Sequence, residues 1–228
     1  LYSFDCQAPL TICASSQLLA YQDSHVKDLQ VAAGGGISVL AGPGTLWLDG
    51  TSTIAGGLGS YAVTNTGYCT LTGTPAFAGQ LVNDGTMTID ATSINFSGWA
   101  NVGVLTNSGV LNLRTGHVYP QIINQGSMGK TTSSGMIIEG LATFESGSFS
   151  VFEGSILMSG GSTWKGGTAT LNRGTSILLV PSFGPNIHEW DGIASFEGDG
   201  TMHVATSPAK PLVIRQSVAL NDASDGET

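Results

Sequence analysis

Short runs in which apolar and polar residues alternate cover most of the chain. Clear examples are residues 45–48 (TLWL), 86–89 (TMTI), 110–113 (VLNL), 168–171 (TATL) and 201–204 (TMHV). Alternation with a period of two, rich in β-branched residues, predicts short strands that bury one face. Glycine interrupts almost every longer window, and only residues 16–29 have apolar positions that fit a helix as well as short strands. The pattern predicts an all-β protein.

A short motif recurs between the predicted strands: an apolar pair or triple followed by Asn-x-Gly. It places Asn65, Asn83, Asn107 and Asn124 at spacings of 18, 24 and 17 residues. Asn and Gly both tolerate positive φ, so the motif predicts a sharp corner. If the corner recurs on each coil, the four Asn amides stack and hydrogen-bond to the coils above and below.

The recurrence of these units predicts the fold class. Strands this short cannot bury their own apolar face, whereas stacked repeats can. We therefore expect a parallel β-solenoid with irregular coils of about 17–25 residues. The alternative is a β-sandwich or jelly roll built from hairpins, which gives no reason for the corners to repeat in kind.

Changes in residue pattern and composition along the chain suggest three parts. Residues 1–33 precede the alternating pattern and are expected to cap the N-terminal end of the solenoid. Residues 34–206 form the predicted solenoid body. The SPAKP segment at 207–211 interrupts the pattern, so residues 207–228 are expected to hold a last strand and a flexible acidic tail.

The composition narrows the possible partners. The chain has 33 Gly and only 10% charged residues, and its net charge is -9. An ordinary domain has roughly 25% charged residues, so this surface must consist largely of Ser, Thr, Asn, Gly and Gln. An acidic chain without a basic cluster is not expected to bind nucleic acid or an anionic membrane. No apolar stretch is long enough to span a bilayer.

Three cysteines and one sequon bear on the cellular setting. Cys6 and Cys13 are spaced to close a small disulfide loop, which would leave Cys69 as a buried free thiol in a strand. Asn95 begins a sequon, Asn-Phe-Ser, and is a candidate for glycosylation in a eukaryotic source. Few charges and a possible disulfide favour an extracellular or cell-surface location.

The richest group of chemically active residues lies between residues 186 and 200. Carboxylates beside an indole ring suit a sugar-binding or sugar-cleaving groove, because the ring stacks on the sugar and paired carboxyls do acid–base work. The competing interpretation is ordinary turn chemistry, since Asp-Gly occurs there twice. The candidate residues are His188, Glu189, Trp190, Asp191, Glu197 and Asp199.

Other chemistries have no support in the sequence. The histidines and cysteines lack zinc-site spacing, and no calcium loop, nucleophile elbow or phosphate-binding loop occurs. We therefore expect no metal and no cofactor, and we assign no catalytic residue.

The repeated segments resemble a known group of proteins. The runs LVNDGTMTI, VLTNSGVLNL and GTATLNRGTSILLV are similar to the coils of secreted right-handed parallel β-helix proteins, of the adhesin, surface-fibre and pectin-lyase-like types. The resemblance covers about residues 35–205 and implies a right-handed coil and an extracellular setting. It implies no particular chemistry, because the motif encodes a corner and a strand.

These observations favour an extracellular structural or adhesive module of a surface fibre, filament or appendage. Such a module would self-associate through the solenoid ends and expose Ser, Thr and Asn to neighbouring subunits or glycans. The alternative is a carbohydrate-binding or glycan-cleaving β-helix protein of the tailspike or polysaccharidase type. An ice-binding solenoid would need a flat, regular Thr ladder, and the sequence spacing is too irregular to predict one.

Overall fold

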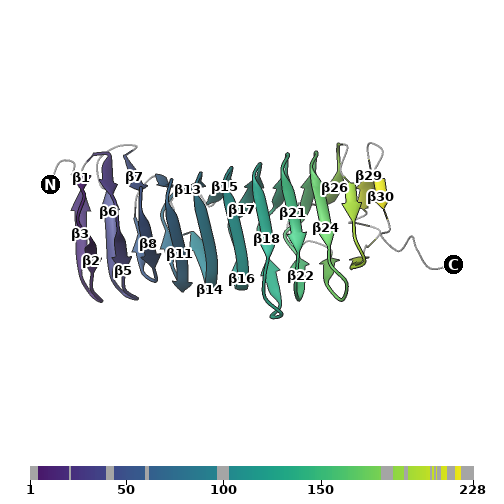
Figure 1. The fold of residues 1–228 in the computed structure, drawn as a ribbon, viewed down its shortest axis with the longest axis horizontal. Helices are drawn as coiled ribbons and strands as arrows, with labels where there is room; N and C mark the ends of the chain where they lie inside the picture. The colour runs from purple at the N-terminus through teal and green to yellow at the C-terminus, as the bar shows by residue number, and fades with distance from the viewer. Residues whose placement is uncertain are drawn as a thin grey trace.

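The protein is an all-β parallel solenoid of about nine turns. The computed structural model describes residues 5–20, 22–39, 44–59, 62–96, 103–180, 187–192, 195–205, 207, 209, 212–214 and 219–221. The described residues contain strands and no helix. Figure 1 shows the coils following one another along the long axis, from the purple N-terminal end to the yellow C-terminal end.

Each coil contributes strands to up to three columns, which we call A, B and C, and every pairing within them is parallel. Column A is an eleven-stranded sheet. Its strands are β1 (Asp5–Cys6), β4 (Ser24–Val26), β7 (Thr45–Leu48), β10 (Ala62–Asn65), β13 (Gln80–Asn83), β15 (Val104–Asn107), β17 (Gln121–Asn124), β20 (Ala142–Phe144), β23 (Ser162–Trp164), β26 (His188–Trp190) and β29 (Leu212–Ile214).

Column B follows column A along each coil. Its strands are β2 (Leu10–Ile12), β5 (Leu29–Val31), β8 (Thr51–Ile54), β11 (Tyr68–Gly73), β14 (Thr86–Phe96), β16 (Val110–Val118), β18 (Ser127–Lys130), β21 (Ser148–Val151), β24 (Thr168–Leu171), β27 (Ser195–Glu197) and β30 (Ala219–Asn221).

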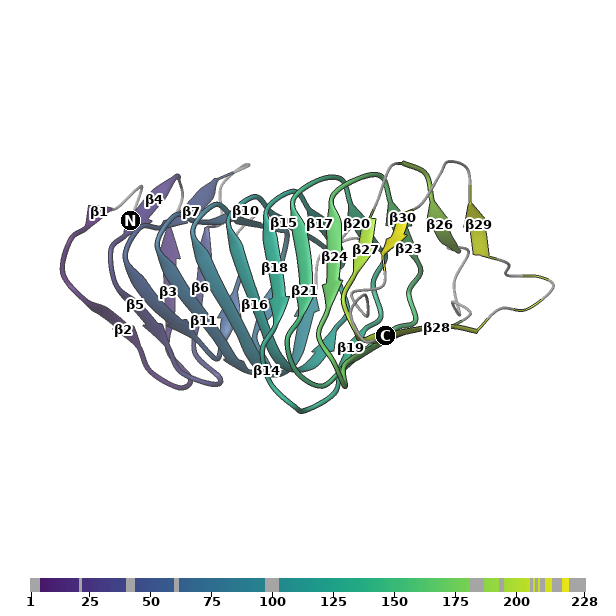
Figure 2. The ribbon, with the colours of Figure 1, turned by 45° about the vertical axis from the view of Figure 1, so that its right-hand side comes forward.

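Column C completes each coil. Its separate strands are β3 (Gln17–Ala20), β6 (Gly36–Val39), β9 (Gly57–Leu58), β12 (Ala76–Phe77), β19 (Met136–Ile138), β22 (Ser155–Met158), β25 (Ser176–Leu179) and β28 (Thr201–Val204). The long strands β14 and β16 run from column B into column C, which joins both columns into one nineteen-stranded sheet. Figure 2 shows the columns as separate sides of the stacked coils.

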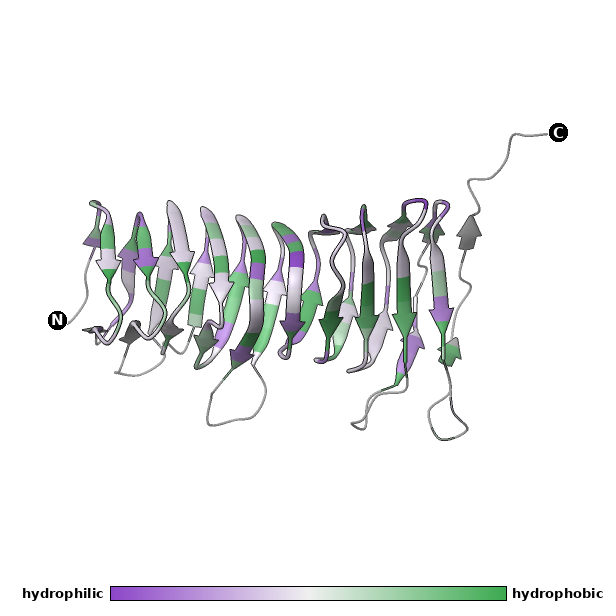
Figure 3. Ribbon diagram, turned by 90° about the horizontal axis from the view of Figure 1, so that it is seen from below, coloured by the Kyte–Doolittle hydropathy of each residue, from purple (hydrophilic) through white to green (hydrophobic). Residues whose placement is uncertain are grey.

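The alternating pattern works as the sequence predicts. Along β7, β13, β21 and β24 the residues alternate between half-buried or exposed positions and buried ones. Figure 3 shows this alternation as short bands of different hydropathy along the strands. The inward residues of all three columns form one continuous apolar core, because each coil covers the core residues of its neighbour.

Parallel pairing of the described strands excludes the sandwich alternative, and residues 16–20 and 22–29 are not helical. Those residues contain β3, β4 and the start of β5. The strands of residues 5–33 pair in register with the coils that follow, so the pairing continues across the boundary expected at residue 34. A capping role for this first segment stays a prediction. β29 and β30 likewise continue columns A and B, and residues 222–228 lie outside the described part.

Candidate functional site

The four corner asparagines form a buried ladder along the end of column A. Asn65 Nδ2 donates to Asn83 Oδ1 at 2.7 Å, Asn83 to Asn107 at 2.7 Å, and Asn107 to Asn124 at 2.8 Å. All four side chains are 0% exposed. Each amide also donates to a backbone carbonyl of the next coil: Thr86, Val110, Ser127 and Ser148 in turn. The ladder clamps successive coils together at one corner.

The glycine of each corner is required for a different reason from the one the sequence suggests. Asn65, Asn83, Asn107 and Asn124 do not have positive φ, and neither do Gly67, Gly85, Gly109 and Gly126. A Cβ on Gly109 would instead lie 2.1 Å from the carbonyl oxygen of Gly85, and the other three glycines show the same clash with the coil before. The glycines therefore permit close approach of stacked corners, and the expectation of left-handed φ is wrong at these positions.

Aromatic side chains take over the ladder position in the later coils. The register places Phe144, Trp164 and Trp190 directly after Asn124 in the same column. Phe144 and Trp164 stack with their ring centroids 3.8 Å apart, and Trp190 packs against Phe196 at 5.1 Å. One corner thus changes from an amide ladder to an aromatic stack, and both are part of the core.

The carbohydrate-binding candidates do not converge on one groove. His188 and Trp190 point into the core, 4% and 5% exposed, so the Trp190 ring does not present a face to a sugar. Glu189 lies between them on the outward side of β26. Asp191 occupies the corner after β26, and Glu197 ends β27. Asp199 follows in the next turn, before β28, so the acidic residues lie at different places around the coil.

His188 is built into a buried chain of hydrogen bonds. Its Nε2 lies 2.7 Å from the carbonyl oxygen of Val180, which can only accept, so Nε2 carries the proton. Nδ1 then accepts from Ser162 Oγ at 2.9 Å, and Ser162 Oγ accepts from Trp164 Nε1 at 3.1 Å. Burial lowers the pKa of His188, against a smaller opposing effect of the Val180 carbonyl. The residue is a neutral core histidine.

The cysteines are free thiols in the structure. Cys6 lies in column A, and Cys13 follows β2 of column B. The disulfide expected between them is not formed here and stays a prediction. Cys69 is 2% exposed, and burial raises the pKa of its thiol to about 12, so it is an inert core residue.

The remaining sequence-based sites are placed but not tested. Asn95 is exposed at the end of β14, and the last residue of its sequon, Ser97, lies outside the described residues. No three His, Cys, Asp or Glu side chains gather into a metal-binding group within the described ranges. In the same part of the chain, no helix is long and apolar enough to cross a membrane.

One buried lysine was not singled out in the sequence. Lys130 is 0% exposed and stands in the core column of β18 between Leu113 and Val151. Its Nζ donates to the Thr132 carbonyl and, at 2.8 Å, to Thr132 Oγ1. Burial lowers the pKa of Lys130, and the charge of Glu153 opposes this. The ammonium group is used to fix the turn that follows β18.

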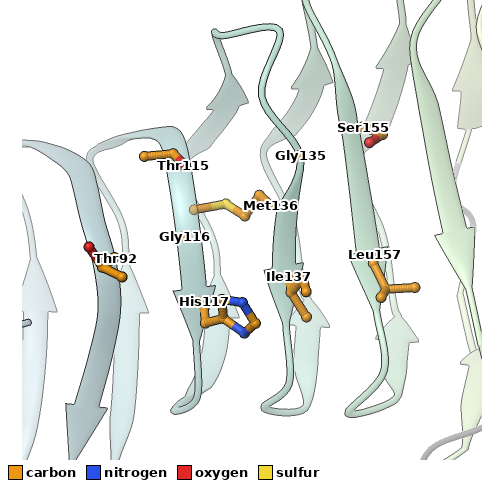
Figure 4. A pocket seen from close by; sticks show the side chains of 9 residues that line it. All are labelled: Thr92, Thr115, Gly116, His117, Gly135, Met136, Ile137, Ser155 and Leu157. Carbon is orange, nitrogen blue, oxygen red and sulfur yellow. The ribbon is translucent and has the colours of Figure 1, made fainter.

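Within the described residues, a groove of about 500 Å³ lies on column C. Figure 4 shows it crossing the coils of β14, β16, β19 and β22. The outward side chains of Ile137 and Leu157 make part of its lining apolar. Three hydroxyl groups also line it, from Thr92, Thr115 and Ser155. The residues that line it are Thr92, Thr115, Gly116, His117, Gly135, Met136, Ile137, Ser155 and Leu157.

A bend in β16 shapes the groove. The register between β14 and β16 shifts after Ile89 and again after Asp90. Gly116, at φ 104°, takes the bend, and a Cβ there would lie 1.8 Å from the carbonyl oxygen of Ala91. The strand then continues into column C with His117 facing outward. The bend redirects this side chain, as β-bulges commonly do.

One titratable side chain, His117, lines the groove and has a carboxylate partner outside the lining. His117 Nδ1 is 2.9 Å from Glu139 Oε1, and the imidazole stacks on Tyr119. Both partners of this pair are about 40% exposed, so solvent screens it. One imidazole, three hydroxyls and an apolar floor can hold a small neutral ligand. The paired carboxyls that glycoside cleavage needs are not among its lining residues.

The chain matches no protein-family model, no curated protein and no solved structure. The structure confirms the parallel solenoid fold that the resemblance implied, whereas no relative assigns the chain to the adhesin or pectin-lyase-like type.

Proposed function

We propose that the chain is an extracellular structural or adhesive module of a surface fibre or filament, and that copies stack end to end. The observation that carries this proposal is the state of the two ends. Six apolar residues pack against the core but stay partly exposed, and five of them lie at the ends: Cys6, Leu10 and Leu18 at one end, Met202 and Leu212 at the other. The sixth, Phe96, ends β14 in a middle coil. The counterparts of the five end residues in central coils are almost fully buried, because a coil covers them on each side.

The two ends are compatible with each other. In the described residues, β1, β2 and β3 pair only with the coil that follows, and β28, β29 and β30 pair only with the coil before. Open strand edges invite further pairing. A second copy placed against the last coil would extend the columns in the same parallel direction. Such contact is heterologous and propagates into a filament.

The backbone of β2 allows a sharp test of this stacking. Leu10 N–H and the Ile12 carbonyl bond to the next coil, so Thr11 between them directs its backbone groups toward the open edge. Thr11→Pro removes one edge donor and leaves the existing pairing intact. Thr11→Ala keeps the donor and is the matched control.

Light scattering and negative-stain microscopy of the same samples measure the result. We expect the wild type and Thr11→Ala to form assemblies much larger than the 23.3 kDa chain, with a mean mass that rises with protein concentration. In the microscope these assemblies should appear as filaments one solenoid wide. Thr11→Pro should shift the mass toward the monomer. A wild type that stays monomeric at high concentration, or a Thr11→Pro variant that assembles equally well, contradicts end-to-end stacking.

Composition supports the extracellular part of the proposal. With 10% charged residues, the surface presents mainly hydroxyl, amide and glycine groups. A glycan-cleaving function receives less support, because the carboxylates of residues 186–200 are separated around the coil and Trp190 is buried.

A further inference from the structure

The outward side of column B carries a regular array of hydroxyl groups. In the strands β8, β11, β14, β16, β18, β21 and β24, two outward positions per strand align from coil to coil. We call this surface the hydroxyl face. The first column of it is Thr51, Tyr68, Thr86, Val110, Ser127, Ser148 and Thr168. The second is Thr53, Thr70, Thr88, Asn112, Gly129, Ser150 and Thr170.

The array is regular although the coils differ in length. Coils of 18, 24 and 17 residues leave the Asn corner in register, and column B starts three residues after each Asn. The outward positions therefore repeat at about 4.8 Å from coil to coil and about 6.6 Å along the strand. The irregular sequence spacing, which argued against a regular ladder, does not disturb it.

Two aromatic rings project from the hydroxyl face, whose other side chains are short. Tyr68 is 67% exposed, and Phe152, just after β21, is 51% exposed. The Phe152 ring lies over Gly129, since a Cβ there would be 3.2 Å from its Cε2. Gly129 and Tyr68 are three coils apart, so the rings are separated by about 14 Å along the solenoid axis.

The hydroxyl face has no charged residue at its fourteen positions, as the two columns above show. Charges begin at its border, where Arg114 and Asp90 form an ion pair at 3.1 Å. Some hydroxyls already contact one another, as Ser148 Oγ does with Ser127 Oγ at 3.2 Å. A partner with strong charge would lose hydration here without gaining an opposite charge. The face suits an uncharged partner that exchanges hydrogen bonds repeatedly along one line.

We propose that the hydroxyl face binds an uncharged polysaccharide chain lying along the solenoid axis. Tyr68 and Phe152 stack on sugar rings at two points, and the side chains of Thr86, Thr88 and Asn112 between them bond to the sugar hydroxyls. This names the partner of the adhesive function proposed above and rests on it. The two raised rings disfavour ice, since a flat crystal surface could not rest on the hydroxyls between them.

Binding is tested by retention of the full chain on uncharged polysaccharides (cellulose, mixed-linkage β-glucan, mannan and starch) and on charged pectate and alginate. We expect retention on at least one uncharged polymer and none on the charged ones. Tyr68→Ala and Phe152→Ala should each weaken it about three- to tenfold. Thr88→Lys, which places a charge between the rings, should weaken it further.

Tyr119→Ala is the matched control, because Tyr119 is 45% exposed on a different side of the coil, beside the groove. This variant should bind as the wild type does. Loss of binding with Tyr119→Ala but not with Tyr68→Ala would move the site to the groove and overturn the proposal. So would equal retention on charged polymers, retention on none, or inhibition of ice recrystallisation that depends on the hydroxyl face.

The Thr11→Pro variant separates this proposal from the assembly proposal. Its single-chain affinity for the polysaccharide should equal that of the wild type, because the hydroxyl face does not include the ends. Assembly without polysaccharide binding would leave the structural function standing and reject the hydroxyl face as its site. Polysaccharide binding by a strict monomer would reject end-to-end stacking alone.

Discussion

Asn107 is an interior member of the amide ladder, and Asn65 is its first. Asn107 accepts from Asn83 and donates to Asn124, whereas Asn65 donates to Asn83 and its own Oδ1 is buried without a partner. Asn107→Ala therefore takes away the acceptor of Asn83 Nδ2 and the donor to Asn124 Oδ1. Asn65→Ala takes away only the donor to Asn83 Oδ1, and it removes the unmatched Oδ1 of Asn65 itself. We expect Asn107→Ala to lower the free energy of unfolding by about 1–3 kcal/mol more than Asn65→Ala does.

Denaturant unfolding of both variants measures this difference. Equal losses would show that the side-chain links between coils contribute little and that the bonds to backbone carbonyls dominate.

Substitutions at two glycines distinguish the cost of a steric clash between coils from the cost of backbone strain. Gly109→Ala puts a Cβ against the Gly85 carbonyl, which is fixed backbone, so the stacked corner has to open. Gly174 has φ 79° but nothing near the position of its Cβ, so Gly174→Ala introduces strain alone. We expect a cost of about 1–3 kcal/mol for Gly174→Ala and of more than about 4 kcal/mol for Gly109→Ala. Thermal or denaturant unfolding would contradict the packing argument if the two variants were alike.

At the scale of one coil, the hydrogen-bonded chain through β23 and β26 makes the fold sensitive to acid. The folded-state pKa of His188 lies below its ordinary value near 6.5, so between these two values the unfolded chain binds more protons. The stability from neutral His188 is complete above about pH 6.5 and is lost as the pH falls toward the folded-state pKa.

Thermal melts between pH 7.5 and 5 test this effect. The melting temperature of the wild type should fall across this range more steeply than that of His188→Gln, which cannot take up the proton. Parallel curves for the two proteins would remove His188 as the cause.

At the scale of strands and turns, the sequence predicted those features that are set by residues close together along the chain. The alternation at residues 86–89 predicted a strand, which the structure has, and the recurring Asn corners predicted amides in register, which hydrogen bonds from Asn65 to Asn124 now link. The burial of Trp190 and the hydroxyl face were not predictable in the same way. They depend on which residues share a column, and that register is set by coil lengths and bends such as the one at Gly116.

For the whole molecule, each coil contacts mainly its two neighbours, so stability should be greatest where both neighbours are present. In hydrogen exchange measured on the full chain, we expect the backbone amides of β13 to β24 to exchange most slowly, and those of β1 to β3 and β28 to β30 fastest. Uniform protection along the chain would show a single cooperative unit instead. Slower exchange at the ends in concentrated samples would accompany the stacking proposed above.

The unpaired Oδ1 of Asn65 has a consequence for how such a protein can lengthen. A ladder of amides has one unmatched acceptor at its beginning, whatever its length, and every added asparagine contributes one more link. A duplicated coil inserted between Asn65 and Asn124 would therefore add a link without creating a new unmatched end. The same coil duplicated elsewhere would begin a second ladder with its own buried orphan. Gene duplication should be tolerated best in the middle of this segment, which makes the asparagine corner the natural place for the solenoid to grow.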